Sequence, residues 1–67
     1  MPGNPLYRED MEVTFRRDGE QLQGTIEIVN AYGVFEDRGQ PYYDILANVS
    51  GTYILYKGVP ESDILYF

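Results

Sequence analysis

The chain has no cysteine, no histidine and no tryptophan among its 67 residues. Without cysteine no disulfide can hold the fold together, and the sequence carries no sign of the redox compartment. Without cysteine or histidine, zinc fingers, haem ligation and Ser-His or Cys-His nucleophilic pairs are excluded. We therefore expect no cofactor, no metal ion and no catalytic residue, and we predict that the protein is not an enzyme.

Basic residues are scarce as well, since 5 lysines and arginines stand against 11 acidic residues for a net charge of -6. Nucleic-acid backbones and anionic membrane surfaces are bound mainly through Lys and Arg, so both are disfavoured as partners. No apolar run approaches the roughly 20 residues of a membrane span. The opening MPGNPLYRED has no basic segment followed by an apolar one. We therefore expect no signal peptide and a cytoplasmic location.

Hydrophobic residues make up 43% of the chain, which is just enough to bury the core of one small domain. Residues 1–10 contain two prolines and a glycine and predict a flexible N-terminal flank. Residues 11–67 are predicted to form the folded domain. Nothing in that segment has the periodicity of a long helix.

Residues 11–30 predict a β-hairpin. Apolar and polar side chains alternate on both sides of Asp18-Gly19, a turn signal because glycine accepts positive φ at little cost. The alternation places Ile26 and Ile28 together on the buried face. Residues 31–35 either close the second strand or begin a loop, and the charges, glycine and proline that follow predict a turn.

Residues 42–47 predict a third strand with Tyr43, Ile45 and Ala47 on one face, and residues 52–57 predict a fourth. A single helical turn is expected over residues 59–63, where Pro60 fixes φ. A short last strand follows it. Five short strands separated by turns predict an all-β fold, a small antiparallel SH3-like barrel, with an OB-like barrel as the alternative.

Four blocks of sequence carry a resemblance: FRRDG at 15–19, GTIEIV at 24–29, YDIL at 43–46 and LYKGVPESD at 55–63. Over about residues 11–64 the chain resembles a group of small bacterial proteins associated with mobile genetic elements and phages. The resemblance implies an SH3-like barrel. It implies no activity, cofactor or partner, because no biochemistry is assigned to that group. A nucleic-acid-associated barrel of a mobile element or phage is the alternative function.

Carboxylates are the remaining candidates for chemistry. Glu61 and Asp63 lie two residues apart, and Glu36 and Asp37 are adjacent. Such pairs do acid-base chemistry or bind hard cations only when one member is desolvated in a cleft. We interpret them instead as a solvated face, with Ser62 or Asp63 capping the helical turn.

Tyrosine is the abundant residue, with seven copies in so short a chain. We expect Tyr43 and one of Tyr53 or Tyr56 to pack inward. The candidate binding residues are Tyr32, Tyr42 and Tyr53, because exposed tyrosines give contact area at modest entropic cost. The expected partner is another protein or a peptide, and a homodimer is the nearest rival. The alternative interpretation is that the tyrosines simply cover the barrel as amphipathic side chains.

Overall fold

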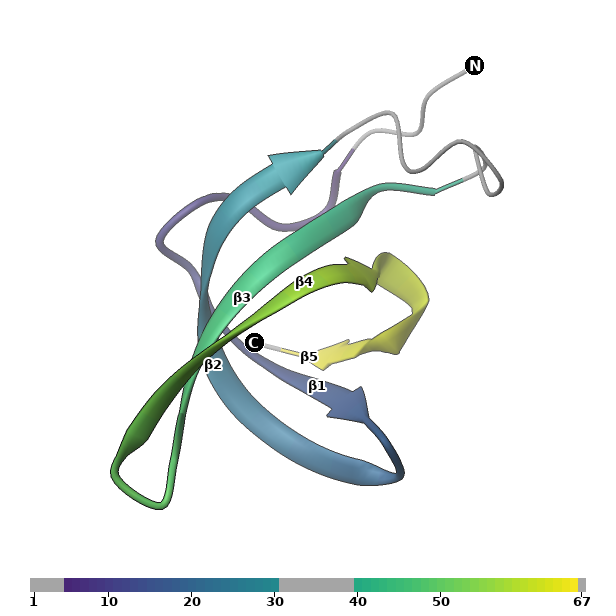
Figure 1. Cartoon of the computed structure of the whole chain (residues 1–67). Coiled ribbons are helices and arrows are strands. Elements are labelled where there is room, and N and C mark those ends of the chain that lie inside the picture. Colours follow the sequence, from purple (N-terminus) through teal and green to yellow (C-terminus); the bar gives the residue numbers. More distant parts are fainter. Residues whose placement is uncertain (1–4, 31–39, 67) are drawn as a thin grey trace.

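A computed structural model of the chain describes residues 5–30 and 40–66. Within these residues the elements are β1 (Glu12–Arg17), β2 (Glu20–Asn30), β3 (Tyr42–Val49), β4 (Thr52–Pro60), the 3₁₀ turn η1 (Glu61–Asp63) and β5 (Ile64–Tyr66). The strands form one antiparallel sheet in the order β4-β3-β2-β1-β5 (Figure 1). The all-β fold, the first hairpin and the single helical turn before the last strand are confirmed. The choice between an SH3-like and an OB-like barrel stays a prediction.

Two tight turns connect the hairpins. Asp18 and Gly19 both have positive φ, 53° and 81°, and so do Ser50 and Gly51, at 54° and 86°. Two positive φ values in a two-residue loop match the right-handed twist of the flanking strands. In the second turn the side chain of Asn48 accepts a hydrogen bond from the Gly51 N–H at 2.9 Å. The turn predicted at Asp18-Gly19 is therefore confirmed, whereas residues 31–35 and most of the turn predicted after them lie outside the described residues.

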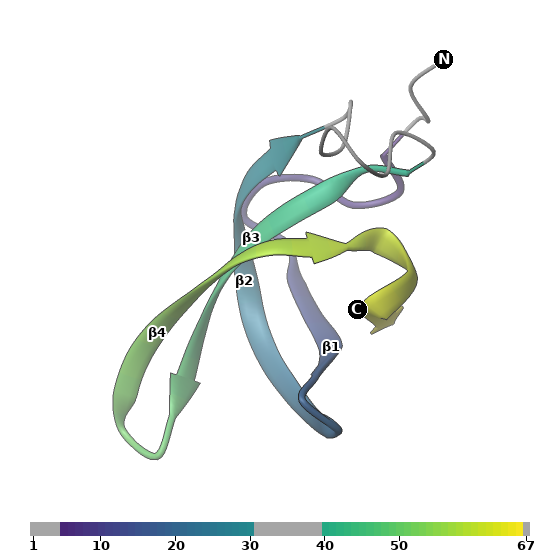
Figure 2. The same ribbon diagram turned by 45° about the vertical axis from the view of Figure 1, so that its right-hand side comes forward.

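The sheet curls, so that β5 comes to lie opposite β4 across the core in both ribbon views (Figures 1 and 2). Within the described residues β4 pairs only with β3, and β5 pairs only with β1. The sheet is therefore open between these two edge strands. The 3₁₀ turn η1 connects the end of β4 with the start of β5.

The core lies on the concave face of the curled sheet. Its buried side chains are Val13, Phe15, Ile26, Tyr43, Ile45, Ala47, Val59 and Ile64. The predicted face of Tyr43, Ile45 and Ala47 is confirmed. Tyr56 is the second inward tyrosine, since its ring meets Phe15 edge-on at 5.5 Å between centroids.

Ile28 departs from the predicted alternation. Ile26 lies opposite Ile45, but Ile28 lies opposite Asp44, so one extra residue of β2 interrupts the pairing with β3. Such a bulge reverses the facing of every later side chain on its strand. Ile28 is consequently 52% exposed instead of buried. Val29 packs against the core in its place.

Strand β4 runs three residues further than the predicted end at Lys57. A second bulge permits this, because the pairing of β3 with β4 shifts between Tyr43 and Ile45. Gly58 lies in this bulge with φ 68°, and its N–H donates to the Asp44 side chain at 3.0 Å. Val59 and Pro60 therefore remain in the strand, and the 3₁₀ turn begins at Glu61 instead of residue 59.

The segment before β1 lies against the folded sheet from Leu6 onward. The Asp10 N–H donates to the Ile26 carbonyl at 2.8 Å, which extends the pairing beside β2. The Leu6 N–H donates to the Glu61 carboxylate at 3.0 Å, and the Tyr7 N–H to the Tyr43 hydroxyl at 3.4 Å. The predicted boundary between flank and domain at residue 10 stays a prediction.

Candidate binding groove

The three tyrosines predicted as a binding surface do not form one patch in the described residues. Tyr53 is exposed on β4, whereas Tyr42 is partly buried at the opposite end of β3. Tyr53 pairs with Asn48 and Tyr42 pairs with Pro60. The positions of Tyr42 and Asn48 on β3 therefore separate the two tyrosines by about 20 Å, at roughly 3.3 Å per residue. Tyr32 lies outside the described residues.

Tyr53 instead belongs to a groove of about 480 Å³ on the outer face of the sheet. The lining residues come from β1, β2, β3, β4 and β5 and are Glu12, Val13, Thr14, Gln23, Gly24, Thr25, Leu46, Asn48, Tyr53 and Tyr66. A second groove of about 430 Å³ shares Thr14, Gln23, Asn48 and Tyr66 with it. The shared residues make the two grooves one continuous surface, which we call the outer groove.

The outer groove exists because the two hairpins diverge. Strands β2 and β3 pair from Gly24 opposite Ala47 toward Asn30, and not before Gly24. Beyond that point the hairpin β1–β2 and the hairpin β3–β4 separate and end apart (Figures 1 and 2). At the last pair before the hairpins separate, Gly24 permits a close approach of β2 and β3, because a Cβ placed there would lie 2.7 Å from Ile45 Cγ2 and 2.7 Å from the Leu46 carbonyl oxygen.

The floor of the outer groove offers uncharged hydrogen-bonding groups. Thr14 pairs with Gln23 across β1 and β2, and Thr25 pairs with Leu46 across β2 and β3. Thr14 is buried, while Gln23 and Asn48 are exposed. Amide and hydroxyl groups of this kind donate and accept hydrogen bonds at once, so they suit a ligand that presents both, such as a peptide backbone.

Two tyrosines from opposite edge strands line the outer groove. Tyr53 of β4 is 68% exposed and Tyr66 of β5 is 57% exposed. A tyrosine that stays exposed offers an apolar ring and a polar hydroxyl to a ligand. Tyr66 was not singled out from the sequence. Its place becomes visible only through the pairing of β5 with β1, which sets Tyr66 opposite Thr14.

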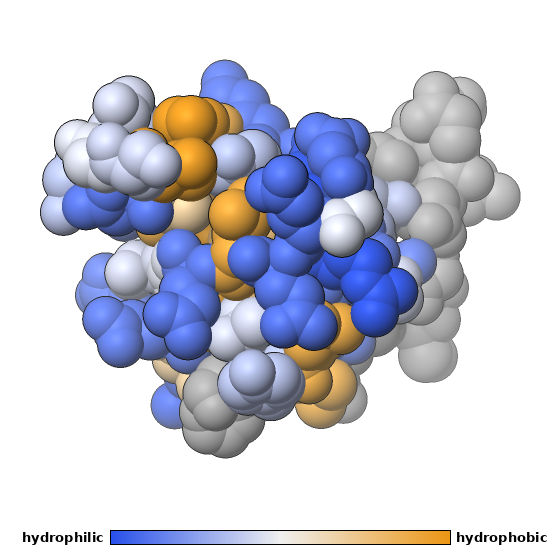
Figure 3. Space-filling model, turned by 90° about the horizontal axis from the view of Figure 1, so that it is seen from below, coloured by the Kyte–Doolittle hydropathy of each residue, from blue (hydrophilic) through white to orange (hydrophobic). Residues whose placement is uncertain are grey.

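The face seen from below carries mainly hydrophilic residues, with hydrophobic ones set between them (Figure 3). Exposed apolar side chains elsewhere on the outer side of the sheet include Ile28 and Leu55. Leu55 lies opposite Leu46, which lines the groove. The outer face of the sheet therefore carries both polar and apolar exposed side chains.

A separate cluster joins the core to the 3₁₀ turn. The Tyr43 hydroxyl donates to Glu61 Oε2 at 2.8 Å, and the Tyr7 ring meets the Tyr43 ring edge-on at 5.7 Å. Burial, and next the hydrogen bond to Glu61, raise the pKa of Tyr43 well above its ordinary value of 10.0. The Glu61 carboxylate thus accepts two structural hydrogen bonds, from the Tyr43 hydroxyl and from the Leu6 N–H.

The cap expected from Ser62 or Asp63 is absent from η1. No side chain caps the turn at Pro60, and the Ser62 N–H instead donates to the Gln40 side chain at 2.9 Å. The Glu61 N–H donates to the Pro41 carbonyl at 3.0 Å. Residues before β3 therefore hold the turn, so the two segments are fixed together.

Within residues 5–30 and 40–66, no three Asp, Glu, His or Cys side chains gather as a metal site would require. The same residues include no helix with the length and apolar character that crossing a membrane would take. Comparison of the chain with protein-family models, curated proteins and solved structures found no match in any of the three.

Proposed function

We propose that the protein is a non-catalytic interaction module that binds an extended peptide segment of another protein in the outer groove. The carrying observation is the pair of exposed tyrosines, Tyr53 and Tyr66, on either side of a floor of amide and hydroxyl groups. Aromatic side chains with one polar end are enriched among residues that contribute most to binding. Uncharged amides complement the alternating donors and acceptors of a peptide backbone.

The size of the outer groove supports a short segment rather than a broad protein face. The part of it that Tyr53 and Tyr66 line has a volume of about 480 Å³, within the range of roughly 300 to 1,000 Å³ typical of ligand sites. Its lining residues come from every strand of the sheet, from β4 to β5. A peptide of a few residues fills such a site, while a flat interface would need a larger continuous apolar area.

Nucleic acid is a poorer fit to the same surface. Among residues 5–30 and 40–66, the side chains that line the outer groove include no Lys or Arg, and they include Glu12. Phosphate groups are bound chiefly by Lys and Arg, and a carboxylate beside them repels them. The mobile-element or phage barrel that binds nucleic acid therefore receives no support from the groove.

Selection of peptides tests this proposal. The immobilised chain is used to select from a phage-displayed library of random peptides, in parallel with the double variant Tyr53→Ser/Tyr66→Ser. Leu6→Ser is the matched control, because Leu6 is 70% exposed and does not line the groove. We expect the original chain and the control to enrich the same peptides, and the double variant to enrich none of them.

Circular dichroism and urea unfolding are used to check that the original chain, the double variant and the Leu6→Ser control are all folded. Failure to enrich any peptide above background would overturn the proposal, as would enrichment of the same peptides by the double variant. A concentration-dependent dimer in sedimentation equilibrium, abolished in the double variant, would also overturn it and assign the outer groove to a second copy of the chain.

A further inference from the structure

Glu12 is the one charged side chain among the described residues that line the outer groove. It is exposed at the start of β1. No ion pair or hydrogen bond of its side chain is found within residues 5–30 and 40–66. Its carboxylate is therefore available to a ligand without first breaking an internal contact.

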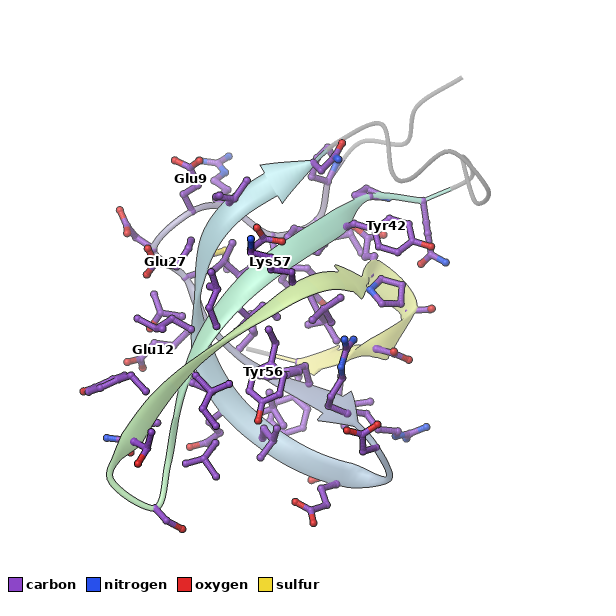
Figure 4. All side chains as sticks on the ribbon, viewed as in Figure 1. Glu9, Glu12, Glu27, Tyr42, Tyr56 and Lys57 are labelled. Carbon is purple, nitrogen blue, oxygen red and sulfur yellow. The ribbon has the colours of Figure 1, made fainter. Side chains whose placement is uncertain are left out.

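The surroundings of Glu12 are acidic as well. Glu9, Glu12 and Glu27 lie along one side of the ribbon (Figure 4). Thr25, the cross-strand partner of Glu12, lies two positions before Glu27 on β2. The net charge of the whole chain is -6. The potential at this end of the outer groove therefore favours a cation.

Tyr66 lies diagonally across from Glu12 on the same face of the sheet. Tyr66 is the cross-strand partner of Thr14, and Glu12 is two residues along β1 from Thr14. Two residues of a strand span about 7 Å, so the ring and the carboxylate are neighbours on one face. An ammonium or guanidinium group between them would meet a carboxylate and a π-face at once.

Tyr53 lies at the other side of the outer groove, on β4 opposite Asn48. Leu46 and its partner Leu55 are the apolar side chains beside it. That side carries no acidic lining residue among those described, so it suits an apolar or aromatic side chain of the ligand. The two ends of the groove therefore differ in chemistry.

Resting on the proposed function, we infer that the outer groove selects a peptide segment carrying a lysine or arginine, whose cation sits between Glu12 and Tyr66. The rest of the segment crosses the amide floor toward Tyr53. The occupant is a basic segment of a partner protein, and the charge of the groove excludes an acidic or phosphorylated one.

Peptides enriched in the library selection supply the first measurement. We expect Lys or Arg in nearly every enriched sequence, at one fixed position relative to the other shared residues. Enriched peptides with no excess of Lys or Arg would overturn this inference while leaving the proposed function intact. Absence of any enriched peptide would overturn the proposed function itself.

Peptide-binding affinities supply the second measurement of this inference. One enriched peptide, labelled with fluorescein, is compared with its Lys→Gln or Arg→Gln counterpart by fluorescence polarisation, using the original chain, Glu12→Gln and Glu20→Gln. Glu20 is the matched control because it is exposed, carries the same charge and does not line the groove.

We expect Glu12→Gln to weaken binding of the basic peptide about three- to ten-fold, the size of one exposed ion pair with an adjacent ring. The Gln-containing peptide should bind the original chain and Glu12→Gln equally. Equal losses from Glu12→Gln and Glu20→Gln would overturn the inference, because only net charge would then matter. Displacement of the peptide by a single-stranded oligonucleotide would also overturn it.

Discussion

The hydroxyl of Tyr43, on the core face near the start of β3, donates a 2.8 Å hydrogen bond to Glu61 of the 3₁₀ turn. The same carboxylate oxygen accepts the Leu6 N–H at 3.0 Å. One side chain of the turn thus joins a core strand to the segment that precedes β1. The Glu61 carboxylate thus links three parts of the chain that are distant in sequence: the segment before β1, strand β3 and the 3₁₀ turn.

Substitution of Tyr43 by phenylalanine keeps the ring in the core and removes the donor to Glu61. We expect the free energy of unfolding to fall by about 1 to 3 kcal/mol, the range for a hydrogen bond to a charged group. Urea denaturation at neutral pH measures it. Tyr53→Phe is the control, because the exposed Tyr53 makes no hydrogen bond among the described contacts, and its stability should match that of the original chain. Equal stability of both variants would contradict the prediction.

Stability should also fall in alkaline solution, because burial and the Glu61 hydrogen bond raise the pKa of Tyr43 above 10.0. In the folded state the phenol keeps its proton at a pH where the unfolded chain has released it. The stabilisation is fully present below about pH 10 and is lost as the pH rises beyond it. Urea midpoints between about pH 8 and pH 11 should decline more steeply for the original chain than for Tyr43→Phe. Parallel declines would refute the assignment.

The bulge in β2 gives Ile26 and Ile28 different burial. Ile26 is fully buried whereas Ile28 is 52% exposed. We expect Ile26→Ala to cost about 2 to 5 kcal/mol of unfolding free energy. Ile28→Ala should stay within about 0.5 kcal/mol of the original chain. Thermal and urea unfolding of the two variants compares them directly, and similar losses would mean that strict alternation holds and that the bulge is absent.

Alanine at Gly24 tests the close approach of β2 and β3. Its Cβ would lie 2.7 Å from Ile45 Cγ2 and from a backbone oxygen, and a strand carbonyl cannot move aside cheaply. We expect a loss of about 1 to 3 kcal/mol, the usual cost of overpacking. Gln21→Ala is the control, because Gln21 is exposed on the same strand and its substitution should leave the unfolding free energy within about 0.5 kcal/mol of the original chain. If Gly24→Ala were as stable as this control, the strands would have room between them.

Local patterns predicted the strands well where alternation is uninterrupted. Tyr43, Ile45 and Ala47 share the core face as their spacing requires. Ile28 was misplaced because one extra residue inverts the facing beyond it, and the sequence gives no local sign of that residue. The longer β4 has the same cause, since the bulge at Gly58 lets the strand continue to Pro60.

The outer groove was beyond reach of local patterns for a different reason. Tyr53 was chosen correctly as an exposed residue, but its neighbours are set by pairings between distant strands. Tyr66 comes beside Thr14 only because β5 returns to β1. Tyr42 was grouped with Tyr53 from exposure alone, and exposure carries no information on distance along the sheet.

The pairing of the first strand with the last has a consequence for biosynthesis. A ribosome releases β1 early, yet the partner that covers its open side, β5, emerges only after the four other elements. Until then Thr14 lacks its cross-strand partner, Tyr66. Sheets built from such long-range pairings fold slowly, and a nascent chain with an uncovered strand is prone to associate with others. A nascent chain halted before residue 64 would therefore leave β1 with β2 alone as its neighbour among the described strands.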